Sequence, residues 1–307
     1  MNLESENQIE SEEFSSEVFL KTFSKKIKHY DSLFISSFPQ KINPMELINY
    51  SSHAETKFME FDLTSQELIS DLSTLTAHLT CRVREQTEDG TIVDLPPGTT
   101  VGAIPGSILN NAVRNLRVFL YNTQISPEKS NRYSLLSYIF EYFNKANVAP
   151  KGINYLNGSY FDQAEENFLV TSEGKAISKA NLDAEVISQG FYESGEFFKL
   201  SASNVFMDRI NSPFLFSNLN LLLNTIKLKI GIEVRGSDES GFILRYDNST
   251  NSSLDGRKFL FIVDDFHLSL LRLRPLERIK SKIHRLLSHQ LHFPLINMKL
   301  HETILIR

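Results

Sequence analysis

The sequence of 307 residues contains no tryptophan and a single cysteine, Cys81. One cysteine cannot form an intramolecular disulfide, so nothing in the composition indicates an oxidising compartment. No apolar run approaches the roughly 18–20 residues that a membrane-spanning helix requires. The N-terminal stretch, MNLESENQIESEEF, is acidic and polar, which is the opposite of a signal peptide. The sequence therefore predicts a soluble intracellular protein that is not secreted and does not contact a membrane.

An excess of positive charge is also lacking, because 32 Lys and Arg stand against 37 Asp and Glu, a net charge of -5. This balance argues against a general electrostatic affinity for nucleic acid, although local basic patches survive such an average. What the chain does have is aromatic residues, with 23 Phe and 10 Tyr. An aromatic-rich, strand-compatible composition favours a β-dominated globular fold over a helical bundle.

Recognisable catalytic motifs are missing as well. There is no phosphate-binding loop or dinucleotide fingerprint, and Gly106–Ser107 lacks the flanking residues of a nucleophile elbow. Asp264 and Asp265 are adjacent in a strand pattern, where neighbouring side chains face opposite ways, so they predict a bend or bulge rather than an acid–base pair. The sequence therefore predicts no catalytic residue, no metal site and no cofactor, and a protein that is not an enzyme.

Strand patterns dominate the chain from residue 56 onwards. The clearest is Leu75–Arg84, where apolar residues, with Cys81 on their side, alternate with polar ones, as expected of a strand with one face in the core. A second alternation covers Asn224–Arg235, and Asp89–Gly90 indicates a hairpin turn. Further strands are expected at Lys57–Leu63, Leu116–Tyr121, Phe242–Tyr246, Lys258–Val263 and Phe266–Leu273.

The other segments suggest how the chain is organised. Residues 1–32 are expected to form a disordered or extended N-terminal arm, and the two prolines within 33–50 indicate an extended peptide along a surface. Residues 33–307 are expected to form one domain, interrupted by an irregular insertion at about 145–205. Helices are predicted in two connections, at Tyr133–Phe143 and from Pro275, as a first helical residue, to about Gln290.

Taken in order, these segments resemble the major capsid proteins of Maverick/Polinton-type elements and related double-stranded DNA viruses of eukaryotes. The resemblance extends from about Leu33 to the C-terminus, is weak across 145–205, and depends on the order and spacing of the motifs. Each motif alone is an unspecific strand or helix pattern. The segments that carry it are Leu33–Phe34, Phe38–Pro39, Met59–Leu63, Val101–Leu120, Arg132–Phe140, Ile226–Val234, Gly241–Leu244, Val263–Pro275 and Phe293–Leu295.

The resemblance implies an all-β fold, an antiparallel jelly-roll sandwich of the viral capsid type with helices in the connections. It further implies a structural protein that self-associates into capsomers or with other capsid proteins and is located in the virion. Members of the family carry two tandem jelly rolls, whereas this chain matches only the first. A host-domesticated single jelly roll, acting as a binding module in the nucleus or cytoplasm, is therefore the alternative.

A basic segment near the C-terminus is the candidate contact for nucleic acid or another partner. Six cationic side chains between residues 272 and 285 accompany the single carboxylate of Glu277. A basic helical face of this kind could contact phosphate groups, or it could be a solvated face opposite an apolar stripe. The six residues are Arg272, Arg274, Arg278, Lys280, Lys282 and Arg285.

Overall fold

The computed structural model of the protein describes residues 34–99, 101–104, 106–125, 133, 137, 158, 195–209, 221–246 and 258–287. The predicted N-terminal arm, most of the aromatic helix at 133–143 and most of the expected insertion at 145–205 lie outside these residues. The domain boundaries drawn from the sequence stay predictions for this reason.

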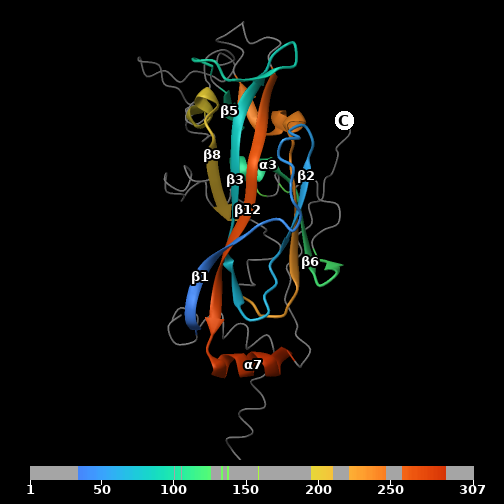
Figure 1. Cartoon of the computed structure of the whole chain (residues 1–307), viewed down its shortest axis with the longest axis vertical. Coiled ribbons are helices and arrows are strands. Elements are labelled where there is room, and N and C mark those ends of the chain that lie inside the picture. The colour runs from blue at the N-terminus through green and yellow to red at the C-terminus, as the bar shows by residue number, and fades with distance from the viewer. Residues whose placement is uncertain are drawn as a thin grey trace, which may run out of the picture.

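Antiparallel strands account for most of the described chain, and they form two main sheets (Figure 1). The first sheet contains β1 (Phe34–Ile42), β3 (Ile69–Gln86), β4 (Ile92–Asp94), β8 (Asn204–Arg209), β9 (Leu221–Leu222) and β12 (Lys258–Pro275). The second contains β2 (Lys57–Asp62), β6 (Val113–Leu120), β7 (Thr123–Gln124) and β10 (Leu228–Val234). A separate two-stranded pair joins β5 (Val101–Ala103) to β11 (Leu244–Tyr246).

The strand order identifies the fold as a jelly roll. In the first sheet β1, β12, β3 and β8 are successive neighbours, and in the second the order is β2, β10, β6 and β7. If these eight strands are numbered along the chain, the two orders are 1-8-3-6 and 2-7-4-5. The chain thus passes repeatedly between two four-stranded arrangements, which is the double Greek key of a jelly roll. The predicted fold class is confirmed.

Two long strands form the centre of the first sheet and lie side by side in Figure 1. β3 and β12 have 18 residues each and pair in register from Lys258 opposite Gln86 to Leu273 opposite Ile69. The predicted alternation in β3 is confirmed, because its inward side chains from Leu75 to Val83 are buried and the intervening ones are half-buried. The register shifts between Val263 and Asp265, which confirms the predicted bulge at the paired aspartates.

The hydrophobic core lies between the two sheets. Phe61 of β2 and Phe266 of β12 face each other with ring centroids 6.0 Å apart, and both are fully buried. Cys81 is fully buried in the same core, as predicted, and burial raises the pKa of its thiol well above the ordinary value. A buried thiol of this kind acts as a small apolar side chain.

Short helices occupy the connections, as predicted. α3 (Ile108–Ala112) precedes β6 and is capped by the side chain of Ser107, which accepts a hydrogen bond from the backbone N–H of Asn110. Two 3₁₀ segments, η4 (Lys199–Ser201) and η5 (Ser237–Phe242), precede β8 and β11. α7 (Glu277–Leu287) follows β12 and lies beyond the lower ends of β1 and β12 in Figure 1.

Several predicted boundaries are wrong, among them the start of the strand expected at Phe242–Tyr246, since Phe242 ends η5 and β11 begins at Leu244. β10 begins at Leu228 instead of Asn224, because the chain turns at Thr225, whose φ of +71° lies in the left-handed region. The Thr225 backbone N–H donates to the Ser65 carbonyl at 2.7 Å, which holds this turn against the loop after β2. Pro275 is the last residue of β12, opposite Phe34, and is not the first residue of a helix. Proline has no backbone N–H to donate, but at the end of the strand this costs the sheet little hydrogen bonding.

Candidate interaction surfaces

β1 forms an exposed edge of the first sheet. It pairs with β12 along one side, and every residue between its buried end residues, Phe34 and Ile42, is exposed. Ile35 and Phe38 are 57% and 37% exposed in spite of their large apolar side chains. The segment is extended and exposed, as predicted, but Phe34–Ile42 is a strand of the sheet itself, which the sequence patterns did not indicate. An edge strand with exposed apolar side chains is a common site of strand or surface contact with another chain.

The connection after β1 continues to cover β12. β1 ends opposite Leu268, and farther along β12 the phenol of Tyr50 accepts a hydrogen bond from the Phe266 backbone N–H at 3.0 Å. Burial raises the pKa of this phenol. A side chain thus replaces a strand as the hydrogen-bond partner of the β12 edge.

The structure divides the predicted basic set into a buried member and exposed ones. Arg272 lies on β12, is 3% exposed, and cannot belong to a solvent-facing basic surface. Its Nε donates to Gln40 Oε1 at 2.7 Å, and its Nη1 donates to the Leu63 carbonyl at 2.9 Å and to the Ser70 hydroxyl. Burial lowers the pKa of the guanidinium, and nearby Asp62 acts in the opposite direction. Arg272 therefore connects three parts of the fold.

The exposed members lie on α7 and at the end of β12. Arg278, Lys282 and Arg285 are exposed at spacings of four and three residues, which places them along one face of the helix. Ile279 and Ile283 are buried on the opposite side, as the apolar spacing predicted. Lys280 is half-buried and pairs with Glu277 Oε1 at 2.5 Å, while Arg274 is exposed on β12. We call Arg278, Lys282 and Arg285 the α7 basic stripe.

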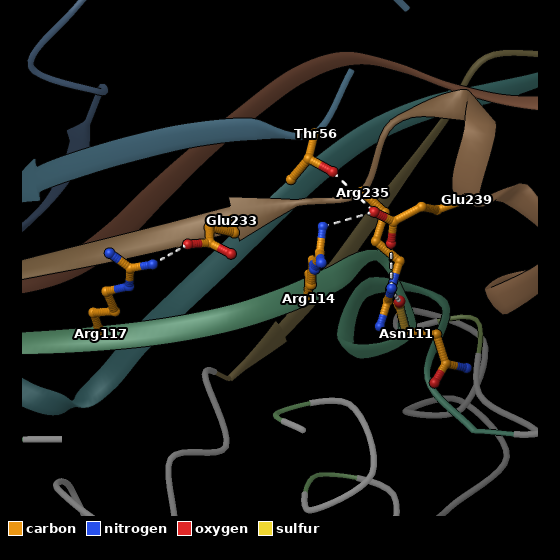
Figure 2. Close-up of polar contacts among 7 residues, drawn as sticks. All are labelled: Thr56, Asn111, Arg114, Arg117, Glu233, Arg235 and Glu239. Atoms are coloured by element: carbon orange, nitrogen blue, oxygen red, sulfur yellow. Dashed lines mark hydrogen bonds and ion pairs between the residues drawn. The ribbon is translucent and has the colours of Figure 1, made fainter. Parts of the chain in front are cut away.

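A cluster of ion pairs that sequence patterns did not identify lies beside the end of β10 (Figure 2). Arg114 Nη1 is 2.9 Å from Glu239 Oε1, and Arg235 Nη1 contacts Glu239 Oε2. The Thr56 hydroxyl donates to Glu239 Oε1 at 3.0 Å, and Arg235 Nε donates to the Asn111 carbonyl at 3.2 Å. Arg235 is 7% exposed, and its guanidinium lies 4.6 Å from the centre of the Phe242 ring. We call Arg114, Arg235, Glu239 and Thr56 the Glu239 cluster.

The Glu239 cluster is suited to holding elements together. Its residues come from the segment before β2, from β6, from the residue after β10 and from η5, so one carboxylate joins four separate parts of the chain. Because that carboxylate already accepts from two guanidinium groups and a hydroxyl, it is poorly placed to remove a proton from a substrate. The sequence spacing of 114, 235 and 239 carried no sign of this proximity.

A second ion pair lies on the outer face of the second sheet (Figure 2). Arg117 Nη2 contacts Glu233 Oε1, and the Arg117 guanidinium lies 5.5 Å from the centre of the Phe58 ring. A Cβ at Gly231 would lie 3.0 Å from that ring, so the glycine lets Phe58 lie close to β10. In the sequence, only the glycine at position 231 within a strand pattern indicated that another group lies close to β10 here.

The described residues contain no group of three His, Cys, Asp or Glu side chains arranged to hold a metal ion. Within the same part of the chain, no helix is both long and apolar enough to cross a membrane. The Glu239 cluster, the Arg117 pair and Arg272 each connect elements of the fold through their polar contacts.

No protein-family profile matches the sequence, and no curated protein is significantly similar to it. Among solved structures, the chain is similar to one in the Sputnik virophage structure determined by cryo-EM, with 11% identity and a TM-score of 0.47. It is also similar to the Faustovirus major capsid protein, at 8% identity and a TM-score of 0.42, and to the mavirus major capsid protein, at 10% and 0.43. At these values the likeness concerns the arrangement of strands alone.

The three matches cover 80%, 81% and 77% of this chain but 49%, 56% and 46% of the other chains. The chain therefore spans about half the length of the proteins that it matches. They include major capsid proteins, the class that the sequence motifs resemble. The finer assignment to Maverick/Polinton-type elements stays a prediction.

Proposed function

We propose that the protein is a capsid-type structural protein that self-associates into a viral or virus-derived shell. The observation that carries this proposal is the strand order of the two sheets, which is that of a jelly roll. Jelly rolls also occur in lectins and cupins, so the fold alone does not select a function. The order of the sequence motifs, from Leu33–Phe34 to Val263–Pro275, favours the capsid class among these. In this function the protein is located in the virion and catalyses no reaction.

The exposed surface of β1 is where we expect a neighbouring copy to bind. β1 presents a strand edge together with the exposed apolar side chains of Ile35 and Phe38. A second copy could remove these side chains from water and also satisfy backbone groups along the edge. The prolyl residue Pro39 lies in the middle of β1 and supplies no N–H, so contact between side chains is expected to contribute more than continuous strand pairing.

Self-association is tested by size-exclusion chromatography with light scattering and by negative-stain microscopy. We expect oligomers or particles whose population grows with protein concentration. The paired variant Ile35→Glu/Phe38→Glu should shift the population towards monomer. Val205→Glu is the matched control, because Val205 is 56% exposed on β8, at the opposite side of the sheet. A monomer at every concentration would overturn self-association and leave the jelly-roll fold intact.

A second candidate function is nucleic-acid binding by a host-domesticated module in the nucleus or cytoplasm. The α7 basic stripe favours it, since Arg278, Lys282 and Arg285 are exposed along one helical face. Contacts to phosphates release counterions, so binding should weaken steeply as salt rises. Arg274, exposed on the adjoining strand end, could add a further contact.

A DNA probe in a fluorescence anisotropy titration tests this candidate. We expect binding at low salt that the double variant Arg278→Glu/Lys282→Glu abolishes. The double variant Lys199→Glu/Lys258→Glu makes the same change in net charge on exposed side chains of other elements, and should retain most of the binding. An equal loss in both double variants would indicate nonspecific attraction, and no binding at low salt would remove the candidate.

A further inference from the structure

Two histidines are stacked on the outer face of the first sheet. His78 of β3 and His267 of β12 are directly opposite in register, and their rings are 4.6 Å apart between centroids with an interplanar angle of 9°. His78 Nε2 is 2.7 Å from the Ser269 hydroxyl, and His267 Nδ1 is 2.9 Å from Asp265 Oδ2. Each ring therefore has one polar partner and shares a face with the other ring.

The charges around the pair come from every neighbouring strand. β1 contributes Lys41, whose Nζ is 3.6 Å from Asp265 Oδ2, so that one carboxylate serves both Lys41 and His267. Asp264, at the bulge in β12, pairs with Arg82 of β3 at 3.0 Å and is thereby engaged elsewhere. On β8, Met207 is opposite His78, and Arg209 is opposite Thr76. The phenol of Tyr50, in the connection after β1, lies near Asp265.

This arrangement can accommodate one additional positive charge more easily than two. A proton on His267 would face the Asp265 carboxylate, whereas a proton on His78 has the Ser269 hydroxyl and a second imidazole as its neighbours. Burial lowers the pKa of His78, and the charges of His267 and Lys41 lower it further, while Asp265 acts in the opposite direction. With both rings protonated, two imidazolium groups and Lys41 would share the single carboxylate of Asp265.

We propose that His78 and His267 form a pH-sensitive contact that loosens the attachment of β1 to β12 when both rings are protonated. β1 is the element that can yield, because Phe34 and Ile42 are its only buried residues and it lies at the sheet edge. Movement of its C-terminal end would carry Lys41 away from the two imidazolium groups. Elements with little buried surface open at the lowest free-energy cost. This device belongs to the single chain and does not depend on the proposed shell function.

The direction of the pH effect follows from the depressed pKa of His78. In the unfolded chain this residue titrates near its ordinary pKa of about 6.5. The folded protein binds that proton less readily, so as pH falls below this value the unfolded or locally opened chain takes up more protons. The contribution to stability is therefore fully present above about pH 6.5 and is lost as pH falls below it.

Two measurements on the full chain test the proposal. In an NMR titration of the histidine ring protons, His78 should titrate below the ordinary range, and in the His267→Gln variant its titration should move upwards. Amide hydrogen exchange at the C-terminal end of β1, followed at the one of Lys41 and Ile42 whose N–H is directed at β12 and corrected for the intrinsic effect of pH, should accelerate at least about threefold between neutral and mildly acidic solution through local opening of β1. In His78→Gln this acceleration should largely disappear.

His284→Gln is the matched control, because His284 is an exposed histidine on α7, away from the pair. Its exchange profile at β1 should follow that of the natural sequence. If His78 titrates in the ordinary range, or if His78→Gln retains the full acceleration at acidic pH, the proposal is overturned. If His78→Gln does not fold, the upward movement expected of His78 in His267→Gln decides the question, since no movement would equally overturn it.

Discussion

The buried arginines Arg235 and Arg272 and the exposed cations on α7 are chemically alike but differ in what they contact. Arg235 and Arg272 are 7% and 3% exposed, and each holds several elements together through directed hydrogen bonds. The α7 basic stripe is exposed, where solvent and salt weaken every interaction. A positive charge thus connects the fold where it is buried, whereas on α7 it lies at the solvent-exposed surface.

The largest expected loss of stability comes from adding a side chain at Gly236, the residue after Arg235. A Cβ at Gly236 would overlap the backbone carbonyl groups of Ala54 and Glu55, so Gly236→Ala must displace this loop from η5. We expect the free energy of unfolding to fall by at least about 3 kcal/mol, since backbone atoms cannot move aside as a side chain can. Chemical denaturation measures it. Gly241→Ala is the control, because a Cβ there meets no atom within 4 Å.

Arg272→Met is expected to cause the next largest loss in the free energy of unfolding. It removes the donors to the Leu63 carbonyl, the Ser70 hydroxyl and the Gln40 side chain. Arg272 is only 3% exposed, so water cannot replace these donors. Loss of charged hydrogen bonds in such a site costs about 3 kcal/mol. Thermal unfolding of this variant beside Arg274→Met, at an exposed position, measures the difference. Equal midpoints for the two variants would contradict a connecting role for Arg272.

A smaller loss is expected when the charge at the centre of the Glu239 cluster is neutralised. Glu239→Gln keeps the shape of the side chain but weakens its contacts with Arg114 and Arg235, and should lower the free energy of unfolding by about 2 kcal/mol. The adjacent Asp238→Asn alters a 65% exposed side chain that lies 3.6 Å from Lys258, and should change it by less than about 0.5 kcal/mol. Urea denaturation of both variants distinguishes a half-buried group of ion pairs from an exposed one.

The smallest effect on stability is expected on α7. Arg278→Glu/Lys282→Glu should change the free energy of unfolding by less than about 1 kcal/mol, because exposed charges interact weakly through water. The change should shrink further at high salt. Circular dichroism during thermal unfolding at two salt concentrations checks this. A loss as large as that of Arg272→Met would mean that the α7 basic stripe is part of the folded framework.

Much of the fold could be predicted from the sequence because burial on one side of a strand imposes a period of two. The alternation at Leu75–Arg84 therefore identified β3, and the interruption at Asp264–Asp265 identified the bulge in β12. The start of β10 was wrong because alternation continued through Asn224–Lys227, while the hydrogen bond from Thr225 to Ser65 turns the chain there. The alternation of apolar and polar residues indicates which side chains are buried. It gives no information about a hydrogen bond between backbone groups that are far apart in the sequence.

The candidate sites were less predictable. A run of cations from Arg272 to Arg285 indicated one surface, and the structure places its first member in the interior. The Glu239 cluster and the His78–His267 pair depend on residues more than one hundred positions apart in the chain. Local sequence carries information about neighbours along the chain, so it cannot report which distant side chains share a carboxylate or stack.

The sequence by itself determined the β-rich class, the alternating strands, the core position of Cys81 and the amphipathic character of α7, because each follows from local patterns of apolar and polar residues. The single cysteine excluded an intramolecular disulfide without any structure. Tertiary structure alone decided the jelly-roll strand order, the exposure of β1 and the different fates of Arg272 and the α7 basic stripe. These features depend on which strands pair and what they cover, and burial then sets how strongly each charge interacts.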